Sequence, residues 1–180
     1  MNPTHADVIA STQNWLEKAV IGLNLCPFAK AVQVKQQIRY VVSDATSEEE
    51  LLADLLHELQ FLQDADVNEV ETTLLIHPNV LNDFLDYNDF LEIADAAVGE
   101  LALDGELQVA SFHPDYQFAD AEPQDIENFS NRAPYPTLHL LRESSIDQAV
   151  AAFPDAANIY EHNMETLRKL GIEGWKKLWI

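Results

Sequence analysis

Residues Val109 to Glu143 read VASFHPDYQFADAEPQDIENFSNRAPYPTLHLLRE. The pattern predicts a strand that ends at His113-Pro114, an irregular segment over 114–136, and a second strand from Thr137. This segment carries four prolines and is far longer than the usual connection of about 4–6 residues. Because it is rich in aromatic residues, Asn and Pro, we expect a long ordered loop over a functional site.

Strands and helices alternate along the rest of the chain. Strands are predicted at 38–43, 72–77, 107–113 and 137–142. Helices are predicted at 8–25, from Ser47 past Leu62, at 80–103 with a break near Tyr87-Asn88, from Ser144 or Ser145, and from Pro154-Asp155 to Gly171. The order α-β-α-β-α-β-loop-β-α-α predicts an α/β (or α+β) fold. We expect a single domain over residues 1–180, with helices packed on a four-stranded mixed sheet. Its first three strands are largely parallel, and the fourth runs either way.

The chain carries a net charge of -21, and the charge is unevenly placed. Between Tyr40 and Asn131 there is no Lys or Arg, whereas 23 of the 31 acidic residues fall there. Such a surface repels phosphate backbones and anionic lipids, so we expect neither nucleic acid nor membrane as a partner. A role in solubility is favoured over a dedicated cationic partner.

The compartment is predicted from what the sequence lacks. There is one cysteine, Cys26, so no internal disulfide is expected. The N-terminal residues show no secretory signal, and no apolar run approaches the ~20 residues of a membrane span. We therefore expect a cytoplasmic protein.

Two predicted strands end in the same dipeptide, His77-Pro78 and His113-Pro114. If these strands are parallel, both imidazoles lie at the carboxyl edge of the sheet, where open α/β sheets bind ligands. If the fourth strand is antiparallel to the third, Asn131 and Arg132 return to the same edge. The two histidines, Asn131 and Arg132 therefore define a candidate site.

The catalytic candidates are His113, Cys26 and Asp115. An imidazole titrates near neutrality, so His113 is a candidate acid/base, with Asp115 as a partner. The alternative is a strand-end histidine that caps loop carbonyls. Cys26 is a candidate nucleophile, although a lone cysteine beside Leu25 and Phe28 is more often a small buried hydrophobe.

The ligand-binding candidates surround Arg132, whose planar fork of donors suits a carboxylate or phosphate. The other members are Asn131, Tyr116, His77 and Arg142. The alternative for Arg132 is an ion pair with Asp115, Asp125 or Glu127 that fixes the loop. For His139, which alternates with apolar neighbours, a packed and hydrogen-bonded role is expected.

No cofactor is evident. Neither GxGxxG nor GxxxxGK[ST] occurs in a chain with five glycines. A metal site formed by His77 and His113 is a weak alternative, because none of the candidate ligands is spaced as a local pair.

Three segments carry a resemblance to a known family: GLNLCPFAK at 22–30, SFHPDYQFA at 111–119 and NRAPYPTLHLLRES at 131–144. They resemble the bacterial family of uncharacterised proteins catalogued as domain of unknown function 1415. The similarity covers essentially the whole chain and implies a single-domain bacterial protein, but it supplies no catalytic residue. Ala133 departs from the family pattern, where Ser is usual.

Three functions are compatible with these features. The first is a small enzyme or ligand-binding protein that holds an anionic metabolite at the 113–132 loop. The second is a non-catalytic acidic interaction protein, and the third is a transition-metal-binding protein that uses His77 and His113. The apolar tail at 175–180 is expected to dock on the domain, and a homodimer contact is the alternative.

Overall fold

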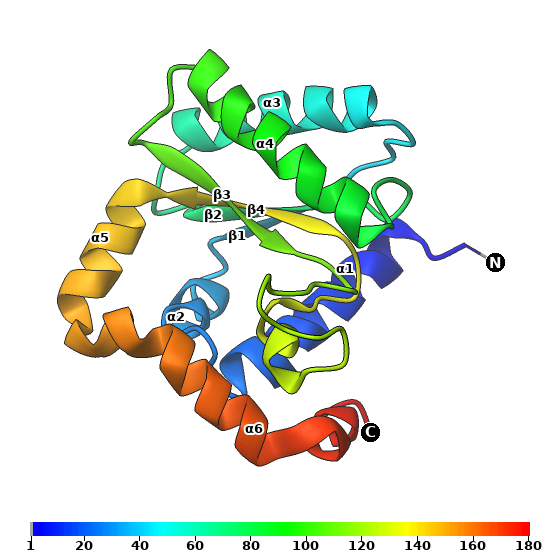
Figure 1. Ribbon diagram of the computed structural model, residues 1–180. Helices are drawn as coiled ribbons and strands as arrows, with labels where there is room; N and C mark the ends of the chain where they lie inside the picture. Colours follow the sequence, from blue (N-terminus) through cyan, green and yellow to red (C-terminus); the bar gives the residue numbers. More distant parts are fainter. Residues whose placement is uncertain (1) are drawn as a thin grey trace.

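The sheet has four strands in the order β1-β2-β4-β3, and helices cover both of its faces (Figure 1). The computed structural model describes residues 2–180. The strands are β1 (Ile38–Val42), β2 (Thr72–Ile76), β3 (Leu107–Phe112) and β4 (Thr137–Arg142). The α-helices are α1 (His5–Trp15), α2 (Ala29–Val34), α3 (Glu48–Asp64), α4 (Phe84–Glu100), α5 (Glu143–Ala152) and α6 (Ile159–Lys177). A π-helical segment (Leu16–Ile21) continues α1, and 3-10 turns occupy Ile126–Asn131 and Pro154–Asn158.

The predicted mixed sheet is confirmed. Strands β1 and β2 are parallel, and β4 is antiparallel to both β2 and β3. The first three strands therefore run in the same direction, as the alternation of strands and helices predicts. The fourth strand runs the opposite way and lies between β2 and β3, so the loop at 114–136 returns the chain to the edge that it left.

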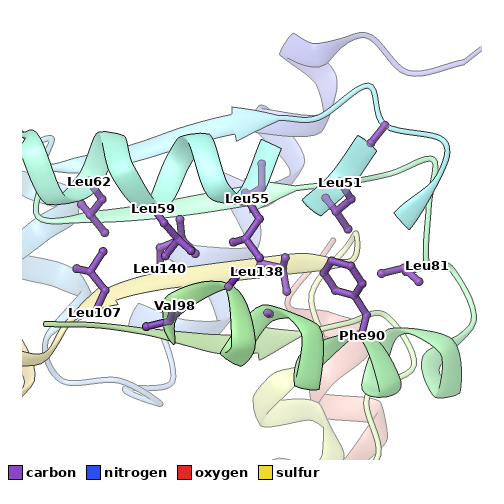
Figure 2. Packing of buried hydrophobic residues seen from close by; sticks show 14 of the residues in the cluster. Leu51, Leu55, Leu59, Leu62, Leu81, Phe90, Val98, Leu107, Leu138 and Leu140 are labelled. Carbon is purple, nitrogen blue, oxygen red and sulfur yellow. The ribbon is translucent and has the colours of Figure 1, made fainter. Parts of the chain in front are cut away.

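One face of the sheet is covered by α3 and α4 (Figure 1). Four leucines of α3 recur at helical spacing and point into the cluster that also contains Leu138 and Leu140 of β4 (Figure 2). All six side chains are fully buried. Burial of a leucine side chain contributes about 1.5–3 kcal/mol, so this layer is a main source of stability. The four residues of α3 are Leu51, Leu55, Leu59 and Leu62.

The opposite face is covered by α1 and its π-helical extension, and α6 packs farther out, against the 3-10 turn at Ile126–Asn131 (Figure 1). Trp15 packs edge-on against Phe112 of β3, and Trp175 of α6 packs against Phe129 of the long loop. The C-terminal tail therefore docks on the domain through Trp175, as predicted. Helix α1 begins with a capping box in which the Thr4 hydroxyl and the Asp7 carboxylate bond to each other's backbone amides.

Two helix predictions are wrong. Helix α4 begins at Phe84, after an Asp83 cap, and runs without a break through Tyr87, whose side chain is fully buried. The polar Asn88 lies on the exposed side of the same helix and breaks nothing. Helix α2 was not predicted, because only one of its six residues is buried and no apolar period marks it. The predicted end at Gly171 is confirmed, because this residue has the non-helical angles φ 66° and ψ 172°, and a second helical part of α6 follows the kink as far as Lys177.

In the described part of the chain, none of the helices has the length and apolar character needed to cross a membrane.

Candidate functional site

Both histidines of the His-Pro dipeptides lie at the carboxyl edge of the sheet, on the α4 face. His77 follows β2 and His113 follows β3, and the two rings flank Tyr87 of α4. The ring centroids of His77 and His113 lie 5.8 Å and 4.9 Å from that of Tyr87. All three side chains are buried. The two histidines therefore lie at the same edge, as predicted for strands that run in the same direction.

The hydroxyl group of Tyr87 lies between the ends of β3 and β4. It donates a hydrogen bond of 2.7 Å to the carbonyl of Thr137 and accepts one of 3.1 Å from the amide of Phe112. Burial raises the pKa of Tyr87 far above its ordinary value, so the phenol stays protonated and able to donate. Tyr87 therefore joins the two strands at the point where they separate.

Both ring nitrogens of His113 are used by the backbone. Nε2 lies 3.0 Å from the carbonyl of Leu81, which can only accept, so Nε2 carries the proton. Nδ1 accepts a hydrogen bond of 3.0 Å from the amide of Asp115. Burial lowers the pKa of His113, which favours the neutral ring. This geometry favours the role in which His113 caps loop groups, and the acid/base role stays a prediction.

His77 has one unused nitrogen. Its Nδ1 donates to the carbonyl of Val80 at 2.9 Å, whereas Nε2 is buried and without a partner among the described residues. Burial lowers the pKa of His77 to about 4. Because both nitrogens of His113 are occupied, the pair offers one free lone pair to a metal. No group of three His, Cys, Asp or Glu side chains in residues 2–180 is placed to hold a metal ion.

Arg132 is bound by the loop in which it lies. Its Nε donates to the carbonyl of Tyr116 at 3.1 Å, and a terminal nitrogen donates to the carbonyl of Pro123. The guanidinium carbon lies 4.4 Å from the centroid of the Phe129 ring, a cation–π distance. Among the described residues Arg132 forms no ion pair. The predicted ion pair with Asp115, Asp125 or Glu127 is therefore absent, and Glu127 pairs instead with Arg168.

Three other candidates accompany the histidines at this edge. The carbonyl of Asn131 accepts from the amide of His113, and its side-chain amide donates to Ser111. The ring of Tyr116 lies 5.2 Å from that of Phe84 at the start of α4. Asp115 is exposed and contacts His113 through its backbone amide. Their binding roles stay predictions, because the described contacts are all internal to the fold.

The structure does not bring the remaining candidates to this edge. Arg142 lies at the opposite end of β4 and donates to the carbonyls of Ala65 and Val70 before β2. Cys26 belongs to the core on the α1–α6 face, so the sheet separates it from His113. His139 donates a hydrogen bond of 2.8 Å to the hydroxyl group of Thr72 and is packed as expected.

A groove lies elsewhere, between the edge strand β1 and helix α3. Its larger part has a volume of about 400 Å³, and a second hollow of about 330 Å³ follows α3 further and shares His57 with it. The larger part is lined by the end of β1, the turn after it and one side of α3. The lining includes Val42, Ser43, Asp44, Glu50, Asp54 and His57.

Carboxylates dominate this groove. Asp44 faces only His5, Asp54 accepts from the Ser43 hydroxyl, and Glu50 accepts from the Thr46 amide. The hydrogen bond from the Thr46 amide lowers the pKa of Glu50, so this carboxylate stays charged. Within residues 2–180, no Lys or Arg forms an ion pair with these three carboxylates.

One cation lies beside the groove, and it is already neutralised. Arg39 of β1 bonds both oxygens of the buried Glu58, at 2.8 and 3.2 Å, and stacks 3.9 Å from the ring centroid of Phe61. Arg39 therefore cancels the charge of Glu58 and leaves Glu50 and Asp54 without an ion-pair partner among the described residues.

The family model described as protein of unknown function (DUF1415) matches residues 7–177. The chain belongs to this family. No curated protein and no solved structure matches the chain. The DUF1415 description names no activity, so the function of the chain has to be argued from its own residues.

Sequence reasoning singled out neither Tyr87 nor the groove of this DUF1415 chain. Nothing in the sequence marks which hydroxyl group will reach a strand end, because that depends on the seating of α4. The groove had a signal: Glu50, Asp54 and Glu58 recur every four residues beside the leucine stripe, which places them along one side of α3. The sequence does not show, however, that β1 is an edge strand.

Proposed function

We propose that this protein is a non-catalytic binding protein that holds a cationic partner in the groove between β1 and α3. The observation that carries the proposal is the group of three carboxylates, Asp44, Glu50 and Asp54, that pair with no Lys or Arg among the described residues and surround a hollow of about 400 Å³. A concave surface with one sign of charge attracts a partner of the opposite sign and speeds its association.

The other candidate site offers less to a ligand. At the carboxyl edge, the nitrogens of His113 and the guanidinium of Arg132 are engaged by backbone groups. An anionic metabolite would have to displace the hydrogen bonds of His113, whose loss inside the fold is costly, and Arg132 would offer it only the donors that Tyr116 and Pro123 leave free. The anionic-ligand hypothesis stays a prediction, and unchanged affinity of an Arg132→Ala variant for a ligand found there would refute it.

The proposal is tested with a fluorescent, acetylated and amidated peptide of alternating Lys and Val, Lys-Val-Lys-Val-Lys-Val-Lys. Binding is followed by fluorescence anisotropy at low and at high salt. The groove variant neutralises three carboxylates: Asp44→Asn, Glu50→Gln and Asp54→Asn. We expect it to bind about tenfold more weakly, since exposed ion pairs contribute about 0.2–1 kcal/mol each.

A matched control removes the same number of charges from the exposed side of α4. Its substitutions are Asp89→Asn, Glu92→Gln and Asp95→Asn, all at exposed positions. We expect it to bind as the wild type does, apart from a small change in long-range attraction. Equal weakening in both variants would show that the peptide responds only to net charge, and the proposed function would then be rejected.

A further inference from the structure

Strand β1 ends the sheet with one free backbone edge. The carbonyl of Gln37 accepts from the residue before β2 at 2.9 Å, and the amide of Ser43 donates to the last residue of β2 at 2.8 Å. Backbone groups of successive residues in a strand point to opposite edges. The amides and carbonyls of Ile38, Tyr40 and Val42 therefore point away from β2, where the described sheet has no further strand.

This free edge borders the acidic groove. Val41, Val42 and Ser43 line the same hollow as Glu50 and Asp54 of α3. Strand β1 carries neither a lysine nor a proline, two of the residues that commonly protect a sheet edge. Its one charged side chain, Arg39, turns inward to Glu58. The unpaired backbone groups of β1 and the carboxylates of Glu50 and Asp54 therefore border the same groove.

From this juxtaposition we infer that the cationic partner is an extended, lysine- or arginine-rich protein segment that adds a fifth strand to the sheet beside β1. The inference rests on the proposed function for the sign of the partner's charge and adds the mode of binding. The segment pairs with the backbone of Ile38, Tyr40 and Val42, as in β-strand addition. Because side chains alternate along a strand, every second residue faces α3, and basic residues there meet Asp54 and its neighbours.

A second copy of this chain is a poorer occupant. Two β1 strands side by side would bring two sets of the same carboxylates together, between chains that each carry a net charge of -21. Like charges in contact disfavour such a pairing, whereas a basic segment is favoured by the same field.

The decisive probe is the Lys-Val peptide in two N-methylated forms, one methylated at its Val amides and one at its Lys amides. Both keep the charge and the side chains of the parent. In an added strand the amides of one set face β1 and those of the other set face solvent. We expect one isomer to bind wild-type protein about tenfold or more weakly, because its hydrogen bonds to β1 are lost, and the other to bind like the parent.

A substitution in the protein gives the reciprocal test. Val42→Pro removes an outward amide and leaves the bonds to β2 in place, as proline is tolerated on edge strands. We expect it to weaken the parent peptide about tenfold, whereas Val42→Thr, which keeps the amide and the branched side chain, binds like wild type. Circular dichroism and urea unfolding establish that both variants are folded, and the peptide isomers need no variant at all.

The outcomes separate the two proposals. Equal affinities of the two isomers for wild-type protein would overturn strand addition, while the difference between groove and control variants would still support a cationic site. If the groove and control variants bound the peptide equally, the proposed function itself would be rejected. Sedimentation without peptide covers the rival occupant: a wild-type dimer that Val42→Pro dissociates, with no peptide binding, would assign the edge to a second copy and refute the inference.

Discussion

Tyr87 carries a structural role through a single hydroxyl group. In Tyr87→Phe the ring still fills its place, but the amide of Phe112 and the carbonyl of Thr137 lose their partner inside the fold. Unpaired buried groups cost about 1–3 kcal/mol, so we expect the free energy of unfolding to fall by that amount. Urea unfolding measures it, with Tyr160→Phe as control, because Tyr160 is 58% exposed. Identical midpoints for Tyr87→Phe and wild type would contradict this role.

Residue types at the candidate edge could be read from the sequence, but their partners could not. The positions of His77, His113, Asn131 and Arg132 at one edge follow from strand direction alone. Their acceptors are mostly backbone carbonyls, which every residue possesses and no sequence distinguishes. Arg132 illustrates this: its predicted partners were carboxylates, and its observed partners are the carbonyls of Tyr116 and Pro123.

At the level of elements, prediction succeeded where apolar side chains repeat with a clear period. The bounds predicted for the four strands differ from those observed by at most one residue, and Ser47 caps α3 as its capping pattern indicates. Prediction failed for α2 and for the supposed break in α4. Both depend on packing between elements that are distant in sequence. The strand order could not be predicted for the same reason, because β4 lies between β2 and β3 rather than beside β3 alone.

Replacement of two helix glycines by alanine is expected to change the free energy of unfolding in opposite directions. Gly171 has φ 66° and ψ 172° at the kink of α6, a conformation that a side chain strains by about 1–3 kcal/mol. Gly99 lies within α4, where an added Cβ would meet only the Asp104 carboxylate, at 3.4 Å. We expect Gly171→Ala to lower the free energy of unfolding by about 1–3 kcal/mol and Gly99→Ala to raise it by about 0.5–1 kcal/mol. Thermal unfolding of the two variants checks the sign, and a shift in the same direction for both would refute the argument.

The whole molecule combines a strongly negative surface with three buried or packed histidines that stay neutral. Burial lowers the pKa of His77 and His139 to about 4, and it lowers that of His113 as well. In the unfolded chain these rings titrate near 6.5. The unfolded state therefore binds more protons between about pH 6.5 and pH 4, and the stability present above this range is lost as the pH falls through it.

This acid sensitivity is the prediction that belongs to the chain as a whole. The free energy of unfolding should fall by up to about 1.4 kcal/mol per pH unit for each neutral histidine. Protonation of carboxylates relieves the repulsion of a -21 chain, but ordinary carboxylates titrate near pH 4, so the histidines dominate between about pH 6.5 and 5.5. Urea unfolding at several pH values in this interval measures the slope. His139→Gln should reduce it, the exposed His162→Gln should not, and a wild type equally stable throughout would show that these rings accept protons without unfolding.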